Sequence, residues 1–232
     1  MNIKYITRRK EMTISGKEVT IYRSSEKNSP LVVLSSYGDE GAAVFSELKK
    51  LKSADITLAA VGITDWNGEL SPWEIPPVYK NDEPFTGGAD AYLATLTGDI
   101  IPAVIAEAGI DPEYTALAGY SLAGLFALYS MYKTDVFSRI ASASGSVWFP
   151  GFTGFAKSNK LMRAPDRLYL SLGDKESHTR NSIMSQVEKN TRELYDHFGP
   201  LGIRTEFEMN PGNHFRDTAL RMAKGIAWII ES

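Results

Sequence analysis

The sequence predicts an α/β fold, with a mostly parallel central sheet and helices on both of its faces. Short apolar runs of strand length alternate with segments of helical periodicity along most of the chain. One such run leads directly into a glycine-flanked serine and then into a helical segment, within residues 115–133. The 232 residues, of which 43% are hydrophobic, contain no Pro/Gly/Ser-rich linker, so one domain over residues 1–232 is expected.

The first quarter of the chain predicts a hairpin, two strands and a helix. Residues 13–23 alternate around a Ser-Gly pair, as two antiparallel strands do. Residues 31–35 and 56–61 are apolar runs typical of buried strands. Residues 41–51 have helical spacing, and four of their apolar side chains are expected to face the sheet: Ala43, Phe45, Leu48 and Leu51.

The pattern changes over residues 63–90, which include four prolines and two tryptophans and show little periodicity. A connection of this length in a compact domain is usually functional or disordered, and its aromatic content argues against disorder. We therefore expect a loop that borders a substrate site.

The rest of the chain returns to alternation of helices and strands. Residues 91–108 predict a helix that Pro102 bends or divides into two. Further strands are expected at 115–118, 139–144, 167–172 and 203–209, and a final amphipathic helix at 217–230.

The strongest local motif is the turn Gly119-Tyr120-Ser121-Leu122-Ala123-Gly124. It has the form of a nucleophile elbow, in which a strained strand-to-helix turn exposes a serine, although alanine replaces the usual second glycine. The first N–H of the following helix, that of Leu122, has no partner within the helix and can donate to a developing oxyanion. A bare match occurs by chance as a tight turn with an incidental serine, but here it lies between a strand and a helix.

A serine needs a base, and His214 fits best among the three histidines. It lies in a turn-rich loop between the last strand and the last helix, where this fold class places the base. His197 belongs to a helical run, and His178 follows the preceding strand too closely.

The acid is expected in the loop after residues 167–172, where two carboxyl groups are candidates. Its role is to hold the imidazole in the correct tautomer and to stabilise the imidazolium. Glu176 is the preferred residue, and Asp174 is the alternative, with a plain role as a turn residue. A second oxyanion donor is expected from the N–H of Asp39, in the loop that follows residues 31–35.

These motifs resemble the Putative esterase family of α/β-hydrolases, which contains esterase D-like and enterochelin-esterase-like proteins. The resemblance covers almost the whole chain after residue 13. It rests on the serine turn and on three further blocks in the right order: Ser144-Gly145-Ser146-Val147-Trp148, Leu172-Gly173-Asp174-Lys175-Glu176 and Pro211-Gly212-Asn213-His214-Phe215.

The resemblance implies an α/β-hydrolase fold, a carboxylic-ester hydrolase without a cofactor, and Glu176 as the acid. Relatives act on siderophore trilactones, on feruloyl and acetyl esters of carbohydrates, and on small thiol esters, so the substrate stays open. The residues expected to border the substrate are aromatic or lie in the long loop: Tyr37, Asp65, Trp66, Trp73, Tyr79, Tyr120 and Trp148. Tryptophans in long loops also commonly serve only as anchors to the core.

Two other functions keep the same fold. An acyltransferase or thioesterase would use the same three residues with a different acceptor. A non-catalytic binding protein of this fold usually lacks one of the three residue types, all of which occur here in order.

Composition and charge argue against nucleic acid and membranes as partners, so the small-molecule ester that the motifs indicate is the expected partner. A net charge of -3 and a pI near 5.7 argue against nucleic acid. No apolar run reaches the length of a membrane span, and the first residues lack signal-peptide features, so a cytoplasmic location is expected. The chain has no cysteine, and its histidines do not have the spacing of metal ligands. The sequence leaves the oligomeric state open, including a homo-oligomer.

Overall fold

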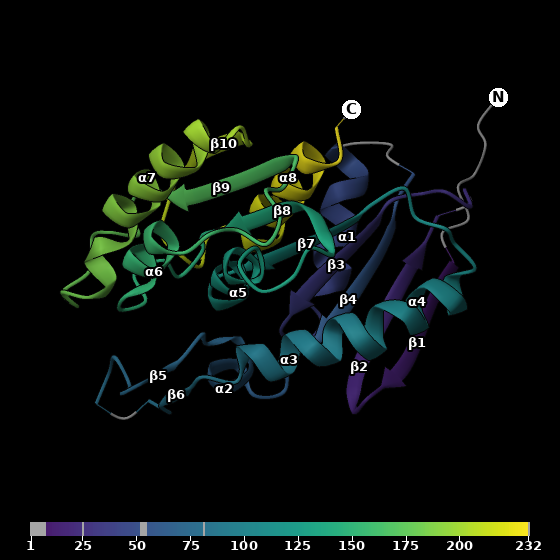
Figure 1. The fold of residues 1–232 in the computed structure, drawn as a ribbon, viewed down its shortest axis with the longest axis horizontal. Helices are drawn as coiled ribbons and strands as arrows, with labels where there is room; N and C mark the ends of the chain where they lie inside the picture. The colour runs from purple at the N-terminus through teal and green to yellow at the C-terminus, as the bar shows by residue number, and fades with distance from the viewer. Residues whose placement is uncertain (1–7, 25, 52–54, 81, 232) are drawn as a thin grey trace.

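The fold is seen in a computed structural model, which describes residues 8–24, 26–51, 55–80 and 82–231 (Figure 1). Residues 1–7, which include the start of the segment examined for a signal peptide, lie outside this range. Within the described residues eight strands form one sheet: β1 (Arg8–Ile14), β2 (Lys17–Arg23), β3 (Leu31–Ser36), β4 (Thr57–Gly62), β7 (Thr115–Tyr120), β8 (Phe137–Ala143), β9 (Arg167–Gly173) and β10 (Arg204–Asn210).

The order of these strands is β1-β2-β4-β3-β7-β8-β9-β10. The hairpin β1–β2 is antiparallel and joins β4 in antiparallel fashion, whereas all pairs from β4 to β10 are parallel. Because parallel strands end at the same edge, the loops after β3, β7, β8, β9 and β10 meet there. The predicted mostly parallel sheet is confirmed.

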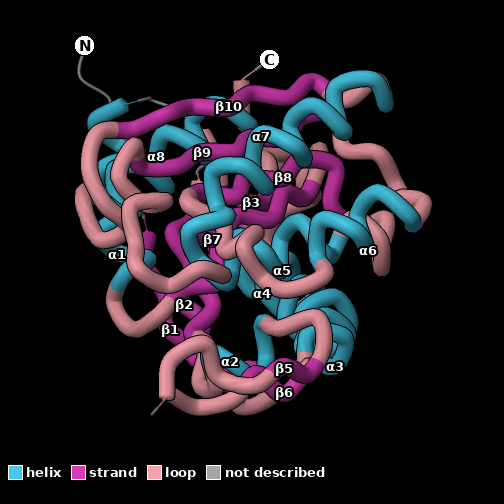
Figure 2. Tube along the Cα trace, turned by 90° about the vertical axis from the view of Figure 1, so that its left-hand side faces the viewer, coloured by secondary structure: helices cyan, strands magenta, loops and turns pink. Residues whose placement is uncertain are grey.

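Helices cover both faces of the sheet, as Figure 2 shows. Helices α1 (Glu40–Leu51) and α8 (Thr218–Ile229) pack together on one face. The other face carries α5 (Leu122–Ser130), α7 (Val187–Phe198) and a continuous helix made of α3 (Ala89–Thr95), a π-helical turn (Leu96–Ile100) and α4 (Ile101–Ala108). The short α6 (Phe152–Ser158), which was not predicted, packs against α7.

Two hydrophobic cores result, one on each face of the sheet. Every residue of α5 is buried, so the helix that follows Ser121 is held on all sides. This burial fixes the position of the turn at its N-terminus. The fold is that of the α/β-hydrolases.

The prediction for the face of α1 was wrong in part. Ala43 is exposed and Leu51 is 45% exposed, whereas Gly41, Val44 and Leu48 are buried. A Cβ on Gly41 would come within 2.3 Å of Ala60 Cβ, so the helix touches β4 through its glycine. That close approach turns Ala43 toward the solvent.

Pro102 lies in the first turn of α4, as expected if it starts a second helical segment, although the segments of Ala89–Ala108 follow one another without a gap. The π-helical turn lies directly before α4, which has its proline at the start, where an N–H is not needed. By length and composition alone this helix could cross a membrane. Its buried residues belong to the core on the sheet, as in the core helices of globular domains.

Candidate active site

Ser121 lies between β7 and α5 in a sharp turn. Its backbone has φ 58° and ψ -122°, which is strained for a residue with a side chain. Hydrogen bonds from Ser121 N to Ala143 O (3.1 Å) and from Ser146 N to Ser121 O (2.9 Å) tie the turn to the loop after β8. The predicted strand–serine–helix context is therefore present.

Small residues allow the strand and the helix to approach each other. A Cβ on Gly119 would lie 2.3 Å from the backbone of Ala123, and one on Gly124 would lie 2.8 Å from Ser142 Oγ. Ala123 itself is fully buried. Glycine is thus needed at positions 119 and 124, while position 123 accepts a methyl group.

A chain of hydrogen bonds joins Ser121, His214 and Glu176. The Ser121 Oγ lies 3.0 Å from Nε2 of His214, and Nδ1 of the same imidazole lies 2.7 Å from Oε2 of Glu176. The three residues come from the loops after β7, β10 and β9. The structure therefore brings together the serine, the histidine and the preferred acid that the sequence singled out.

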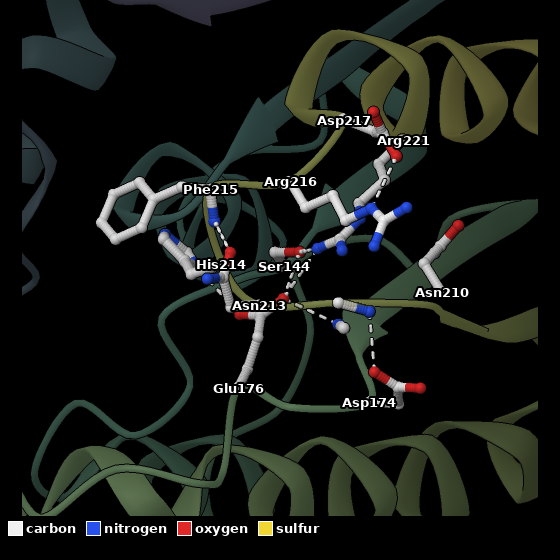
Figure 3. Close-up of polar contacts among 12 residues, drawn as sticks. Ser144, Asp174, Glu176, Asn210, Asn213, His214, Phe215, Arg216, Asp217 and Arg221 are labelled. Carbon is white, nitrogen blue, oxygen red and sulfur yellow. Dashed lines mark hydrogen bonds and ion pairs between the residues drawn. The ribbon is translucent and has the colours of Figure 1, made fainter.

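The carboxylate of Glu176 is almost completely buried, with 4% of its side chain exposed. Its Oε1 accepts hydrogen bonds from Gly173 N (2.7 Å), Ser144 Oγ (2.8 Å) and Arg221 Nη1 (3.1 Å) (Figure 3). Burial by itself would raise the pKa of Glu176, but the hydrogen bonds and the neighbouring imidazole outweigh it and hold the pKa below 4.5. Glu176 is thus ionised at neutral pH and leaves Oε2 to the imidazole.

Asp174, the alternative acid, has a different role. Its Oδ1 accepts a hydrogen bond from Gly212 N at 2.7 Å, and its own N–H donates to Asn210 O at 2.8 Å. These bonds fasten the loop after β9 to the loop after β10 (Figure 3). Asp174 therefore supports the loop that carries His214 and does not contact the imidazole.

Tyr120, expected to border the substrate, instead braces His214. Its hydroxyl donates to the main-chain oxygen of His214 at 2.7 Å, and the two rings lie 5.3 Å apart between centroids. Burial raises the pKa of Tyr120, so the phenol stays protonated and remains a donor. It holds the backbone of the histidine loop.

The candidate oxyanion donors lie at the starts of two helices. Leu122 is the first residue of α5 and directly follows Ser121 in the sequence. Asp39 directly precedes α1. The N–H of Tyr37 is already bonded to Glu40 Oε2 at 3.1 Å. Tyr37 and Asp39 both line a groove beside β1 and β2, and the charge of Asp39 acts on Tyr22 there.

A pocket of about 230 Å³ opens over Ser121. Trp148 lines it, as expected, and so does Tyr79 from the 63–90 loop. Its other lining residues come mainly from the segments after β8, β9 and β10: Ser144, Ser146, Lys175, Glu176, His178, Thr179, Met184, Val187, Asn213, His214 and Phe215. Phe215 is 84% exposed and stands at the rim.

The other residues expected from the 63–90 loop have structural contacts. Asp65 caps the short α2 (Trp66–Leu70) by accepting from Gly68 N at 2.9 Å. Trp73 donates through Nε1 to Pro150 O at 3.1 Å and packs on two phenylalanines. Trp66 meets the exposed ring of Tyr37 edge-on, at 5.9 Å between centroids. Trp73 thus anchors the loop to the core, next to its short strands β5 (Glu74–Ile75) and β6 (Phe85–Thr86).

Sequence reasoning missed several residues of the site. Ser146 Oγ lies 3.3 Å from Ser121 Oγ, and Ser144 and Arg221 contact Glu176. The block around Ser144 and Ser146 supports the family resemblance, but the sequence predicts no role for it. Arg221 lies in a segment that the sequence predicts only as an amphipathic helix. His178 and Met184 line the pocket without a signal in the sequence. No group of three or more potential metal ligands occurs in the described part of the chain.

Comparisons with known proteins identify the family of this chain. A sequence model of the family described as Putative esterase matches residues 19–210. The uncharacterized protein YbbA of Bacillus subtilis is 22% identical over an alignment of 209 residues, which covers 83% of this chain and 84% of that protein.

Solved structures with the same fold include hydrolases. The siderophore hydrolase EstA from Aspergillus nidulans superposes with a TM-score of 0.73 at 21% identity, over 95% of this chain and 93% of EstA. An IroE-like serine hydrolase from Shewanella oneidensis gives a TM-score of 0.77 at 15% identity, over 95% and 79% of the two chains. At these identities the likeness concerns the fold, whereas the family match spans most of the sequence. The chain belongs to the Putative esterase family and has its α/β-hydrolase fold.

Proposed function

We propose that this protein is a serine carboxylesterase in which Ser121 is the nucleophile, His214 the general base and Glu176 the acid that orients the base. The observation that carries the proposal is the unbroken series of contacts from Oγ to Nε2 (3.0 Å) and from Nδ1 to Oε2 (2.7 Å). It begins at a strained serine in front of a buried helix. Membership of an esterase family supports the same chemistry.

In the proposed reaction the Ser121 oxygen attacks the ester carbonyl while Nε2 of His214 takes the hydroxyl proton. The new C–O bond gives a tetrahedral intermediate, and its collapse breaks the bond to the alcohol oxygen, which receives the proton from His214. Water then repeats the sequence on the acyl-enzyme and releases the carboxylic acid. Glu176 keeps Nδ1 protonated and stabilises the imidazolium in both halves.

The developing oxyanion is proposed to accept hydrogen bonds from the N–H groups of Leu122 and Asp39. Leu122 opens α5, whose N-terminal end favours negative charge. The first N–H after β3, that of Tyr37, already donates to Glu40 Oε2. The second oxyanion donor is therefore expected later in that loop. The charge of Asp39 acts on Tyr22, on the side of β2, so the acidic side chain need not oppose the oxyanion.

The lining of the pocket indicates an ester with a flat or apolar group. Trp148, Met184, Val187 and Phe215 offer apolar surface around Ser121, and the volume of about 230 Å³ suits one ring or a short chain. The likeness to the siderophore hydrolase EstA supports siderophore esters as candidates. A panel of acetyl, feruloyl and siderophore esters would rank these candidates.

The covalent mechanism predicts an acyl-enzyme on Ser121. With p-nitrophenyl acetate in excess, we expect an initial burst of about one p-nitrophenol per enzyme. Acid quenching followed by peptide mapping should place one acetyl group on Ser121. Hydrolysis without a burst or a trapped adduct, under conditions where deacylation limits the rate, would contradict the covalent route.

Phe215→Ala is expected to weaken binding of aromatic esters selectively. The ring is 84% exposed, so its removal costs little stability, yet it stands at the rim of the pocket. Ring stacking is worth about 0.5–1.5 kcal/mol, which corresponds to roughly a 2- to 13-fold rise in KM for a feruloyl ester. The KM for an acetyl ester should change less.

Met162→Ala provides the matched control, because Met162 is 63% exposed and does not line this pocket. Equal effects of the two substitutions, or equal effects on both esters, would show that Phe215 does not contact the substrate.

A further inference from the structure

Arg221 is the largest fully buried side chain in the described part of the molecule, with 1% of the residue exposed. It lies in the first turn of α8, where the helix meets the ends of the parallel strands. A buried guanidinium is costly unless charged or polar groups pair with it. The hydrogen-bond partners of the Arg221 guanidinium therefore indicate its role.

These partners come from four different segments, the end of β7 and the loops after β8, β9 and β10. Arg221 Nη1 contacts Glu176 Oε1 (3.1 Å), Tyr120 OH (3.3 Å) and Ser144 Oγ (3.3 Å), and Nη2 donates to Pro211 O at 3.0 Å. Tyr120 directly precedes Ser121, and Pro211 lies three residues before His214. One guanidinium thus joins the segments that carry Ser121, His214 and Glu176, and Figure 3 shows Arg221 beside Ser144 and Glu176.

The backbone is shaped around this group. A Cβ on Gly173 would lie 2.9 Å from Arg221 Nη1 and 2.3 Å from Gly212 O, so only glycine leaves room for the guanidinium and the histidine loop. Ser144 takes up a left-handed conformation, with φ 45°, where its hydroxyl reaches both Glu176 and Arg221. The site is built to hold a cation at this point.

The contacts with Arg221 and its neighbours fix the orientation of the Glu176 carboxylate. Three donors converge on Oε1, one of them charged, while Oε2 accepts from the imidazole. A carboxylate held in this way cannot rotate away from His214 without breaking a buried ion pair. The titratable groups around it are His214 from the β10–α8 loop, Tyr120 from the end of β7 and Arg221 from α8, with Lys175 adjacent in sequence.

We propose that Arg221 is a positioning residue that keeps Glu176 ionised and aimed at His214, and that it supports the histidine loop through Pro211 and Tyr120. The inference rests on the proposed function, because it assigns a role within that reaction. A purely structural role would need only the packing of the side chain, and it predicts no change in the pH dependence of the activity.

The test compares the pH profile of kcat/KM for the wild type, Arg221→Gln and Arg221→Lys, with folding checked by circular dichroism. Loss of the buried cation disfavours the negatively charged state of the Glu176–His214 pair, in which the base can accept a proton, so the acid limb of Arg221→Gln should move to higher pH. We expect kcat to fall up to about 100-fold with KM little changed. Arg221→Lys keeps the charge and should return the acid limb to its wild-type position.

Arg216→Gln is the matched control, since it also removes one cation beside the site but from a side chain that is 62% exposed and pairs with Asp217. Its acid limb should coincide with that of the wild type. If Arg221→Gln does not fold, Tyr120→Phe tests the proposal, because it removes only the hydroxyl that links Arg221 to the His214 carbonyl. It should lower kcat several-fold at unchanged KM.

An Arg221→Gln variant that loses activity with an unmoved acid limb would overturn the proposal, as would a Tyr120→Phe variant with wild-type kcat. The failure of the proposed function is distinguishable, because the wild type would then neither hydrolyse p-nitrophenyl acetate nor become labelled on Ser121 by a fluorophosphonate.

Discussion

Ser121→Ala should lower kcat for ester hydrolysis by roughly 10⁴- to 10⁶-fold and abolish labelling by a fluorophosphonate probe. In the proposed mechanism the Ser121 hydroxyl oxygen bonds to the acyl group, and this oxygen lies 3.0 Å from Nε2 of His214. Alanine also carries a Cβ, so the strained backbone at φ 58° is no worse for it than for serine. Activity and labelling should therefore disappear without loss of the fold.

Ser146→Ala separates the two neighbouring hydroxyl groups. Ser146 Oγ lies 3.3 Å from Ser121 Oγ, whereas the imidazole of His214 is hydrogen-bonded to Ser121 and Glu176. This variant should still be labelled on Ser121 and should lose no more than about tenfold in kcat, the effect of one lost hydrogen bond. If Ser121→Ala retained labelling and Ser146→Ala lost it, the nucleophile would be Ser146.

Glu176→Gln is expected to lower kcat by roughly 10³- to 10⁴-fold with little effect on KM. An amide that turns its NH₂ toward Nδ1 favours the wrong tautomer of His214, and an amide oxygen no longer stabilises the imidazolium. The substitution also leaves the guanidinium of Arg221 without its buried anion. Steady-state kinetics on a p-nitrophenyl ester, with folding checked by circular dichroism, measure the effect.

Asp174→Asn decides between the two acids that the sequence left open. Asparagine keeps an oxygen that can accept the hydrogen bond from Gly212 N, so the loop contact survives. Its kcat should stay within about tenfold of the wild type, as expected for one altered hydrogen bond. A larger loss in Asp174→Asn than in Glu176→Gln would assign the acid to Asp174.

The sequence was sufficient for most of the sheet, because buried parallel strands are continuous apolar runs that stand out from their surroundings. The serine turn was also visible, because glycine is needed where β7 and α5 approach each other. The order of serine, acid and histidine then singled out three residues that the fold brings together.

Contacts between distant segments could not be predicted in the same way. Helix α6 begins after Gly151 and contains Gly154 with two phenylalanines, a composition without a clear polar face. Arg221 has the charge typical of a surface residue, and only the packing of α8 on the strand ends buries it. The face of α1 was misjudged because a glycine contact with β4, and not an apolar side chain, sets its rotation.

The attachment of the 63–90 loop has a consequence for how such enzymes diverge. Contacts that hold the loop include Trp73 Nε1 with Pro150 O, Asn181 Nδ2 with Val78 O, and the packing of Phe85 on Trp148, and none of these three involves Ser121, His214 or Glu176. Selection can therefore reshape or replace this segment as a unit while the hydrolytic machinery stays intact.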